Sequence, residues 1–97
     1  MPVPRGGING VVANGCLHVF GGEGNQSASD MMFRNHDVYN PVTNTWTSLP
    51  DMPIPVHGVT GGAFLNNLIY LPGGARGQGG QDRTTLLQVY RPTMSCQ

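Results

Sequence analysis

Residues 38–41 read Val-Tyr-Asn-Pro and residues 89–92 read Val-Tyr-Arg-Pro, an offset of 51 positions. Three further pairs of segments recur in the same order at an offset of 51 or 52: residues 1–4 and 52–55, 14–15 and 66–67, and 21–22 and 73–74. Four matches in one order make chance a poor explanation. The sequence therefore predicts two tandem copies of one structural unit, residues 1–51 and residues 52–97.

Each copy is predicted to form short β-strands. Asn14-Gly15 follows an apolar, β-branched run and is a strong local signal for a two-residue hairpin turn. Asn66-Asn67 stands at the same place in the second copy, and Asn40-Pro41 begins another predicted turn. The predicted strands cover residues 8–13, 16–20, 34–39 and 45–49, then 59–65, 68–71 and 84–90. The first copy is therefore predicted to form a four-stranded antiparallel meander, and the second copy a meander with only three strands.

The composition agrees with an all-β fold. Fifteen glycines and 8 prolines occupy nearly a quarter of the 97 residues and resist long helices, which excludes a helix bundle. The formal net charge is zero and lysine is absent, so no nucleic-acid partner is expected. No run of 18 apolar residues occurs, so no membrane span is predicted either. The sequence assigns no cellular compartment.

Glycine pairs and aromatic residues recur at fixed places in the two copies. Gly21-Gly22 and Gly73-Gly74 close the second predicted strand of each copy, where they permit a backbone conformation or a close approach that a side chain would block. Tyr39 and Trp46 flank a tight turn. They are predicted to lie on facing strands and to fill the space between adjacent sheets.

With these residues in place, the sequence resembles two tandem kelch motifs. The family pattern is a double glycine after a hydrophobic strand, then a Tyr, then a Trp, and then a link that contains proline. The first copy matches at Gly21, Gly22, Tyr39, Trp46 and Met52-Pro53. The second copy matches at Gly73, Gly74 and Tyr90, while Gln97 stands at the Trp position. The resemblance implies kelch-type β-propeller blades in an incomplete ring.

The number of predicted strands bears on partners. Seven strands are one short of two blades, and a propeller ring typically needs about four to eight blades. We expect a C-terminal propeller fragment or a truncated reading frame, with an assembly of three chains as the rival. The expected partners are the remaining blades or further copies of this chain, joined through blade faces and strand edges. We expect the isolated chain to oligomerise or aggregate.

The sequence assigns no catalytic, cofactor-binding or metal-ligating residue. His18, His36 and His57 lie about twenty residues apart and form no local ligand motif, so structural or solvent-facing roles are expected. His36 and Asp37 are predicted to form a polar pair at a strand edge. Cys16 and Cys96 belong to no CxxC pair, so neither a metal knuckle nor a disulfide scaffold is indicated. They are expected to be two buried or half-exposed thiols.

The loops that follow the second strand of each copy carry the candidate binding residues. Residues 25–33 and residues 73–80 are predicted loops, and the second is rich in glycine. It is also able to form a backbone nest for an anion, but no helix follows that would support a phosphate or dinucleotide motif. Arginine and aromatic residues dominate binding hot spots. The candidate contact residues are Phe33, Arg34, Arg76 and Arg83.

Two classes of function follow. The first is a non-catalytic module that presents its loops to a protein, a glycan or another ligand. The second is part of a propeller enzyme, galactose-oxidase-like or sialic-acid-epimerase-like, whose catalytic residues lie mostly outside this segment. A galactose-oxidase-like copper site needs Tyr, His and a Cys that is cross-linked to Tyr. No such motif is present, so the sequence favours the binding module and implies no cofactor.

Overall fold

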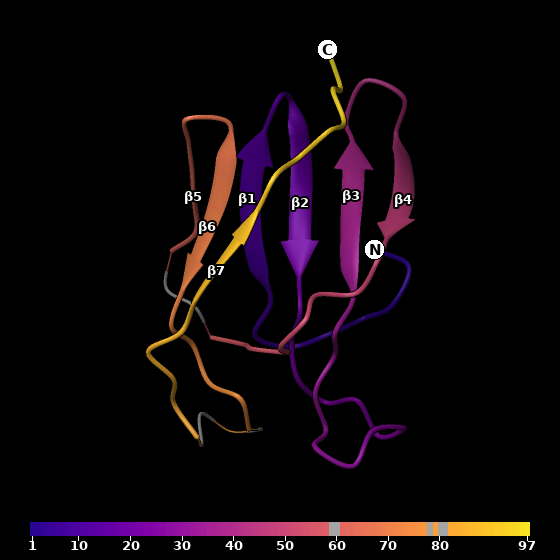
Figure 1. Cartoon of the computed structure of the whole chain (residues 1–97). Coiled ribbons are helices and arrows are strands. Elements are labelled where there is room, and N and C mark those ends of the chain that lie inside the picture. Colours follow the sequence, from indigo (N-terminus) through magenta and orange to yellow (C-terminus); the bar gives the residue numbers. More distant parts are fainter. Residues whose placement is uncertain (59–60, 78, 80–81) are drawn as a thin grey trace.

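The computed structural model of this protein describes residues 1–58, 61–77, 79 and 82–97. Two separate antiparallel sheets form, a first sheet in the order β1-β2-β3-β4 and a second sheet in the order β5-β6-β7 (Figure 1). The strands are β1 Asn9–Ala13, β2 Cys16–Phe20, β3 His36–Asn40, β4 Thr45–Leu49, β5 Ala63–Leu65, β6 Leu68–Pro72 and β7 Leu87–Tyr90. The described residues contain no α-helix, and no helix long and apolar enough to cross a membrane. The predicted all-β class with two blade-like sheets is confirmed.

The strand boundaries agree with the prediction for β2 and β4, differ by one residue for β1 and β6, and begin later than predicted for β3 and β7 for identifiable reasons. β3 begins at His36 rather than at residue 34, because the backbone of residues 33–35 bonds to the double glycine and to the Met52 amide instead of the ladder. β7 begins at Leu87 rather than at residue 84, because the Thr84 amide donates to the Gly74 carbonyl inside a loop. β5 is described from Ala63, and residues 59–60 of that predicted strand lie outside the described residues.

Both predicted hairpin turns are confirmed by their backbone geometry. The φ angles are 53° at Asn14 and 79° at Gly15, and 51° at Asn66 and 65° at Asn67. Positive φ at both central residues defines a type I′ turn, whose twist matches that of the flanking strands. Asparagine tolerates this left-handed region better than other residues with a side chain.

The two sheets repeat the same strand register. Leu17 pairs with Tyr39 between β2 and β3, and Ile69 pairs with Tyr90 between β6 and β7. The offsets in the chain are 52 and 51 positions, the same as those of the sequence repeat. Asp37 of the first sheet is thus structurally equivalent to Gln88 of the second.

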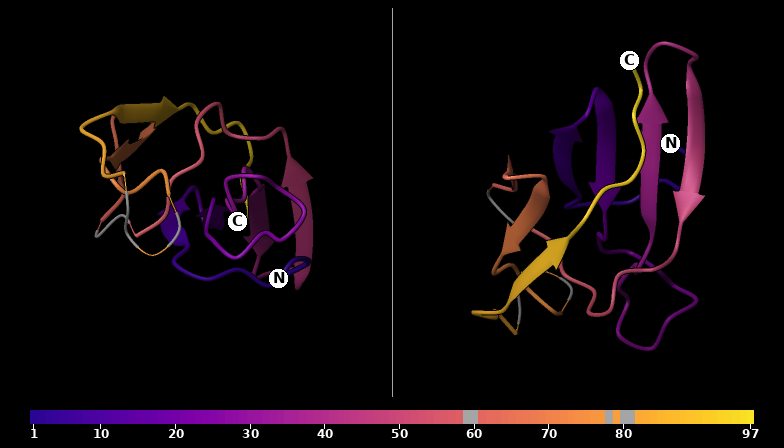
Figure 2. Two further views of the ribbon diagram at one scale, coloured as in Figure 1. Left: turned by 90° about the horizontal axis from the view of Figure 1, so that it is seen from below. Right: turned by 45° about the horizontal axis from the view of Figure 1, so that its top comes forward.

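The inner face of the first sheet packs against the second sheet, with β1 beside β5 (Figure 2). The approach is close, because a Cβ placed on Gly62 would collide with Val11. The buried core between the sheets consists of Val11, Ala13, Phe20, Met52, Val56, Ile69 and Leu71. Burial of this apolar surface is the main force that joins the two repeats.

The double glycine at the end of β2 confirms the expected close approach. Gly21 has a φ of 63°, and a Cβ on it would collide with the backbone oxygen of Val56. Gly22 has a φ of 120° and donates its amide to the same oxygen, 3.3 Å away. The link between the two repeats therefore crosses directly over this glycine pair.

The expectation of two free thiols is wrong, because Cys16 and Cys96 form a disulfide. After β7 the chain crosses the inner side of the first sheet and reaches the β1–β2 turn (Figure 1). There the Cys96 amide donates to the Asn14 carbonyl, 3.0 Å away, and the Asn14 amide group donates to the Met94 carbonyl, 3.4 Å away. Cys16 and Cys96 are separated by 80 residues in the chain, so the sequence did not predict their contact, which depends on the path of the tail.

Candidate functional site

Two loops leave the same end of the two sheets, at the bottom of Figure 1, and we call this end of the molecule the loop end. The first loop, residues 21–35, connects β2 to β3, and the second loop, residues 73–86, connects β6 to β7. Each has its own backbone hydrogen bonds: the Gly24 amide donates to the Met31 carbonyl at 2.9 Å, and the Arg76 amide donates to the Asp82 carbonyl at 2.9 Å. Met32 is completely buried and anchors the first loop. These contacts hold the first loop, and Arg76 and Asp82 of the second loop, in defined positions.

Glu23 and His57 join the two loops. One carboxylate oxygen of Glu23 forms an ion pair with His57 Nδ1, and the other accepts a hydrogen bond from the Gly79 amide at 3.4 Å. His57 is buried, and its Nε2 donates to the Gly77 carbonyl at 2.6 Å. Glu23 was not singled out from the sequence, although it is the only glutamate and directly follows a double glycine. His57 has the structural role expected of it, as the centre of this loop junction.

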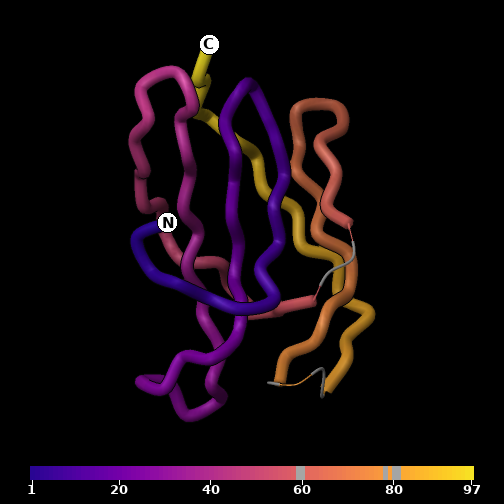
Figure 3. The backbone as a smooth tube through the Cα atoms, turned by 180° about the vertical axis from the view of Figure 1, so that it is seen from behind, coloured from indigo at the N-terminus to yellow at the C-terminus, as the bar shows by residue number. Residues whose placement is uncertain are grey.

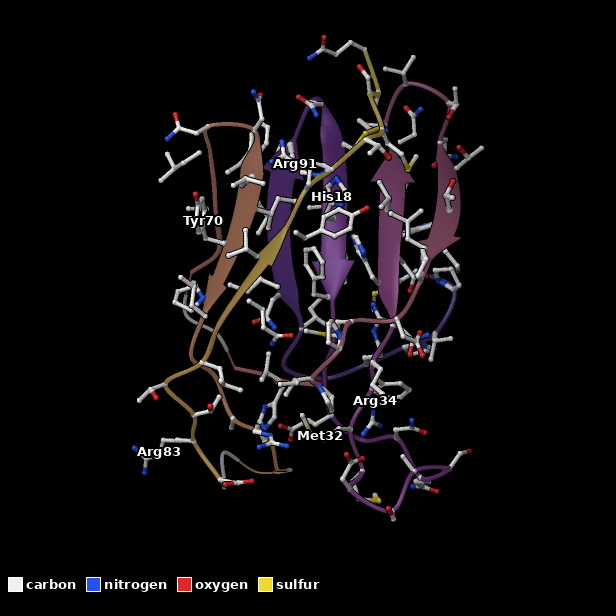
Figure 4. The ribbon with its side chains drawn as sticks, in the orientation of Figure 1. His18, Met32, Arg34, Tyr70, Arg83 and Arg91 are labelled. Carbon is white, nitrogen blue, oxygen red and sulfur yellow. A yellow bond between two sulfur atoms is a disulfide. The ribbon has the colours of Figure 1, made fainter. Side chains whose placement is uncertain are left out.

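The candidate contact residues differ in how far they are already engaged. Phe33 lies under the Arg5 guanidinium, 5.9 Å from ring centroid to carbon, and is half-buried. Arg34 is exposed and forms an ion pair with Asp30 at 3.0 Å. Arg76 and Arg83 are exposed on the second loop. Figure 4 shows Arg34 and Arg83 on opposite sides of the loop end, so the four residues do not form one tight cluster.

Two of the three histidines meet between the sheets. His18 Nδ1 lies 2.9 Å from His36 Nε2, and both side chains are buried. Phe20 stacks on the His36 ring at 4.0 Å, and Tyr90 meets the same ring edge-on at 4.6 Å. Burial lowers the pKa of His18, and burial together with the nearby His18 lowers the pKa of His36 to about 4. At pH 7 both rings are therefore uncharged, and the hydrogen bond between them has a structural role.

The predicted strand-edge pair of His36 and Asp37 is wrong. The two residues occupy an interior strand of the first sheet, and successive side chains of a strand point to opposite faces. His36 points inward, whereas Asp37 points to the outer face, where it accepts a hydrogen bond from Arg5 at 2.9 Å and one from Ser48 at 2.8 Å. The N-terminal segment that carries Arg5 crosses this outer face (Figure 3).

A cavity of about 340 Å³ opens between the sheets, next to β7. Phe20 and His36 of the first sheet, Met52 of the link, and Gln88 and Tyr90 of β7 line it. Its volume falls at the lower end of the range of about 300–1,000 Å³ that is usual for ligand sites. No sequence signal marked this space, because its walls come from three segments that are distant in the chain.

Within the described ranges, no group of three or more His, Cys, Asp and Glu side chains is placed to hold a metal ion. Both cysteines belong to the disulfide, so neither is available for the cross-link to tyrosine that a galactose-oxidase-like site needs.

Comparison with known proteins identifies the family, although no family model matches the sequence. The chain is 31% identical over 94 residues to Kelch-like protein terF of Aspergillus terreus, a match that covers 97% of this chain. It is 32% identical over 77 residues to Kelch-like ECH-associated protein 1B of Danio rerio, a match that covers 79% of this chain. This chain belongs to the kelch-repeat family. It spans 20% of the first relative and 13% of the second. The two sheets are accordingly kelch blades.

Proposed function

We propose that this chain is part of a kelch interaction module that binds a protein partner through its loop end. The observation that carries the proposal is the junction of the two loops through Glu23 and His57, which combines two inter-strand loops into one surface. Binding residues are commonly found on loops that a rigid scaffold positions. The Danio rerio relative is named for its association with another protein, which favours a protein as the partner class.

We propose Phe33, Arg34, Arg76 and Arg83 as the contact residues. Arg76 and Arg83 are exposed, so their side chains are accessible to a partner. Arg34 would exchange its exposed ion pair with Asp30 for a partner group at little cost, because exposed pairs contribute only about 0–1 kcal/mol. Arginine and aromatic side chains supply a large share of binding energy at protein interfaces.

Site-specific photo-crosslinking tests this proposal. A photoreactive amino acid is placed at position 34, 76 or 83, and at position 42 as the control, since Val42 is exposed in the β3–β4 turn at the opposite end of the first sheet. We expect the three loop positions to capture one common protein and position 42 to capture none of it. Capture of the same protein with equal yield from position 42 would contradict the proposal, as would the absence of a common product from the loop positions.

We further propose residues 1–51 and 52–97 as separate blade units whose outer faces associate with further blades or further copies. Leu87 and Val89 of the second sheet are 57% and 50% exposed, and they are equivalent by register to His36 and Val38, which pack inward from the first sheet. Light scattering of the isolated chain should give a mass above 10.3 kDa, reduced toward that value by Leu87→Glu. A monodisperse 10.3 kDa species at all concentrations would contradict this association.

A further inference from the structure

His57 lies where four segments of the chain meet at the loop end. Its backbone pairs with Ala75 of the second loop: the His57 amide donates to the Ala75 carbonyl at 3.0 Å, and the Ala75 amide donates to the His57 carbonyl at 2.9 Å. Glu23 of the first loop pairs in the same way with Gly6 of the N-terminal segment, at 3.2 and 2.8 Å. None of these four bonds uses the His57 ring, so the ring contacts can change while the backbone around them stays in place.

Both nitrogens of the His57 ring face oxygen atoms that only accept hydrogen bonds. Nδ1 meets one carboxylate oxygen of Glu23, and Nε2 lies 2.6 Å from the Gly77 carbonyl. A neutral imidazole carries one N–H group and one bare lone pair, whereas an imidazolium carries two N–H groups. Only the charged ring can therefore donate to Glu23 and Gly77 at once. In the neutral ring, a nitrogen lone pair would face an oxygen lone pair.

The charged groups around the ring leave Glu23 as its electrostatic partner. Within the described part of the chain, Glu23 is the one charged side chain that forms an ion pair or hydrogen bond with the ring. Arg5 of the N-terminal segment is engaged by Asp37 on the outer face. The side chains of His57 and Glu23 are 7% and 26% exposed, so water has little access to replace a lost contact between them. The other charged residues of the link and the second loop are exposed: Asp51, Arg76, Asp82 and Arg83.

The other two histidines belong to a different part of the molecule. His18 and His36 are buried between the sheets, where burial lowers the pKa of both and brings that of His36 to about 4. The charge of a histidine ordinarily changes between about pH 5 and 8. A response of the loop end to pH within this range therefore belongs to the His57 junction rather than to the pair between the sheets.

We propose that Glu23, His57 and Gly77 form a proton-dependent latch that holds the two loops together while the His57 ring is charged. When the ring gives the proton on Nε2 to water, Nδ1–H stays with the Glu23 carboxylate, and the Nε2 lone pair faces the Gly77 carbonyl. The contact with the second loop is then lost, and Gly77 is released. The consequence rests on the proposed function: a partner that needs both loops binds more weakly as the pH rises.

NMR spectroscopy of the isotope-labelled 97-residue chain tests the latch without a partner or a substitution. Between about pH 5 and 8, the nitrogen signals of the His57 ring report which of its two nitrogens carries a proton. We expect the backbone amide signals of Gly77 and Gly79 to follow the titration of the ring. Their heteronuclear NOE values should fall at the alkaline end, because release increases motion on the picosecond to nanosecond timescale. If the ring loses its proton while these NOE values stay high, the latch is overturned.

Glu23→Gln gives the sharpest comparison, because it should hold the latch closed at every pH in this range. The amide nitrogen of the new side chain can donate to a bare Nδ1, its oxygen can accept from the Gly79 amide, and the neutral ring can still donate from Nε2 to Gly77. The NOE values of Gly77 and Gly79 should then be equal at both ends of the range. Asp51→Asn makes the same chemical change at an exposed carboxylate of the link and should respond as the native chain does. A native pH response in Glu23→Gln also overturns the proposal.

A second measurement separates the latch from the proposed function. Photo-crosslinking from position 76 is repeated at about pH 6 and about pH 8. The yield of the common protein should be about fivefold or more lower at the higher pH, and equal at both in Glu23→Gln. Equal yields without that substitution would overturn the control of binding by the latch. If no common protein is captured at either pH, the proposed function fails, and the NMR titration decides on the latch by itself.

Discussion

Replacement of Gly21 by alanine should destabilise this chain through two separate effects. The residue has a φ of 63°, a left-handed conformation that L-residues with a side chain rarely adopt. Its added methyl group would also meet the backbone oxygen of Val56, a residue that is completely buried and whose oxygen accepts the Gly22 amide. A shift of the link away from the added methyl group would therefore disturb both this hydrogen bond and the buried packing of Val56.

The magnitude follows from the two effects taken together. The left-handed conformation costs roughly 1–2 kcal/mol for an L-residue, and overpacking of a tight site costs typically about 1–3 kcal/mol more. A loss of about 2–5 kcal/mol is large against a total stability of about 5–15 kcal/mol. For a domain of this size, the expected fall in Tm is roughly 8–40 °C.

Thermal unfolding, followed by calorimetry and circular dichroism at matched protein concentration, measures the effect. Gly58→Ala is the control, because its φ is 67° and nothing lies within 4 Å of a Cβ placed there. Gly58→Ala should show the conformational cost alone, about 1–2 kcal/mol. If Gly21→Ala and Gly58→Ala lower Tm equally, the collision with the link does not operate and the packing argument is refuted.

Three further predictions concern the disulfide, the interior histidine and the buried ion pair. Cys96→Ser, or reduction by dithiothreitol, should lower the free energy of unfolding by up to about 4–5 kcal/mol, because the disulfide closes a loop across a separation of 80 residues. Urea titrations measure this loss, and the control Ser95→Ala should have little effect. If dithiothreitol leaves the stability of the native chain unchanged, the disulfide is contradicted. The pKa of His36 is lowered to about 4, so between pH 6.5 and pH 4 the unfolded chain binds a proton at this residue and the folded chain does not. As the pH falls through this window, the free energy of unfolding should therefore decrease by up to about 3 kcal/mol, and it should level off below pH 4. His36→Gln should flatten the profile of unfolding free energy against pH, and an unchanged slope would contradict the assignment. Asp37→Ala leaves the fully buried Arg5 side chain without its ion-pair partner and should lower the free energy of unfolding by about 3–5 kcal/mol. In the same titrations, the double variant Arg5→Met, Asp37→Leu should recover most of this loss. If the double variant loses as much stability as Asp37→Ala, the charges themselves stabilise the fold.

Much of the architecture was predictable because it depends on short-range constraints. Asn14-Gly15 and Asn66-Asn67 adopt the left-handed turns that their residue types allow, and these turns set the register of each hairpin. The sequence repeat then carried the same register to the second sheet, where Ile69 faces Tyr90 as Leu17 faces Tyr39. Tyr39 does lie opposite Trp46, as expected for two strands joined by a tight turn.

The site was less predictable, because its residues are distant in the chain. The candidate loops were identified, but nothing in the local sequence joined Glu23 of one loop to His57 of the link. Likewise, His18 and His36 come within 2.9 Å only because β2 and β3 are neighbours in the sheet and Phe20 and Tyr90 close the space around them.

The sequence by itself determined the strand order, the hairpin turns, the repeat and the places where only glycine fits, since these depend on backbone conformation within one unit of about fifty residues. Only the tertiary structure decided which side chains meet between units. The Cys16–Cys96 disulfide, the burial of Arg5 with Asp37, and the cavity beside Gln88 all arise from the paths of segments that are far apart in the chain. Such contacts depend on how the sheets pack and on where the tail crosses them, and neither can be predicted from a local pattern of residue types.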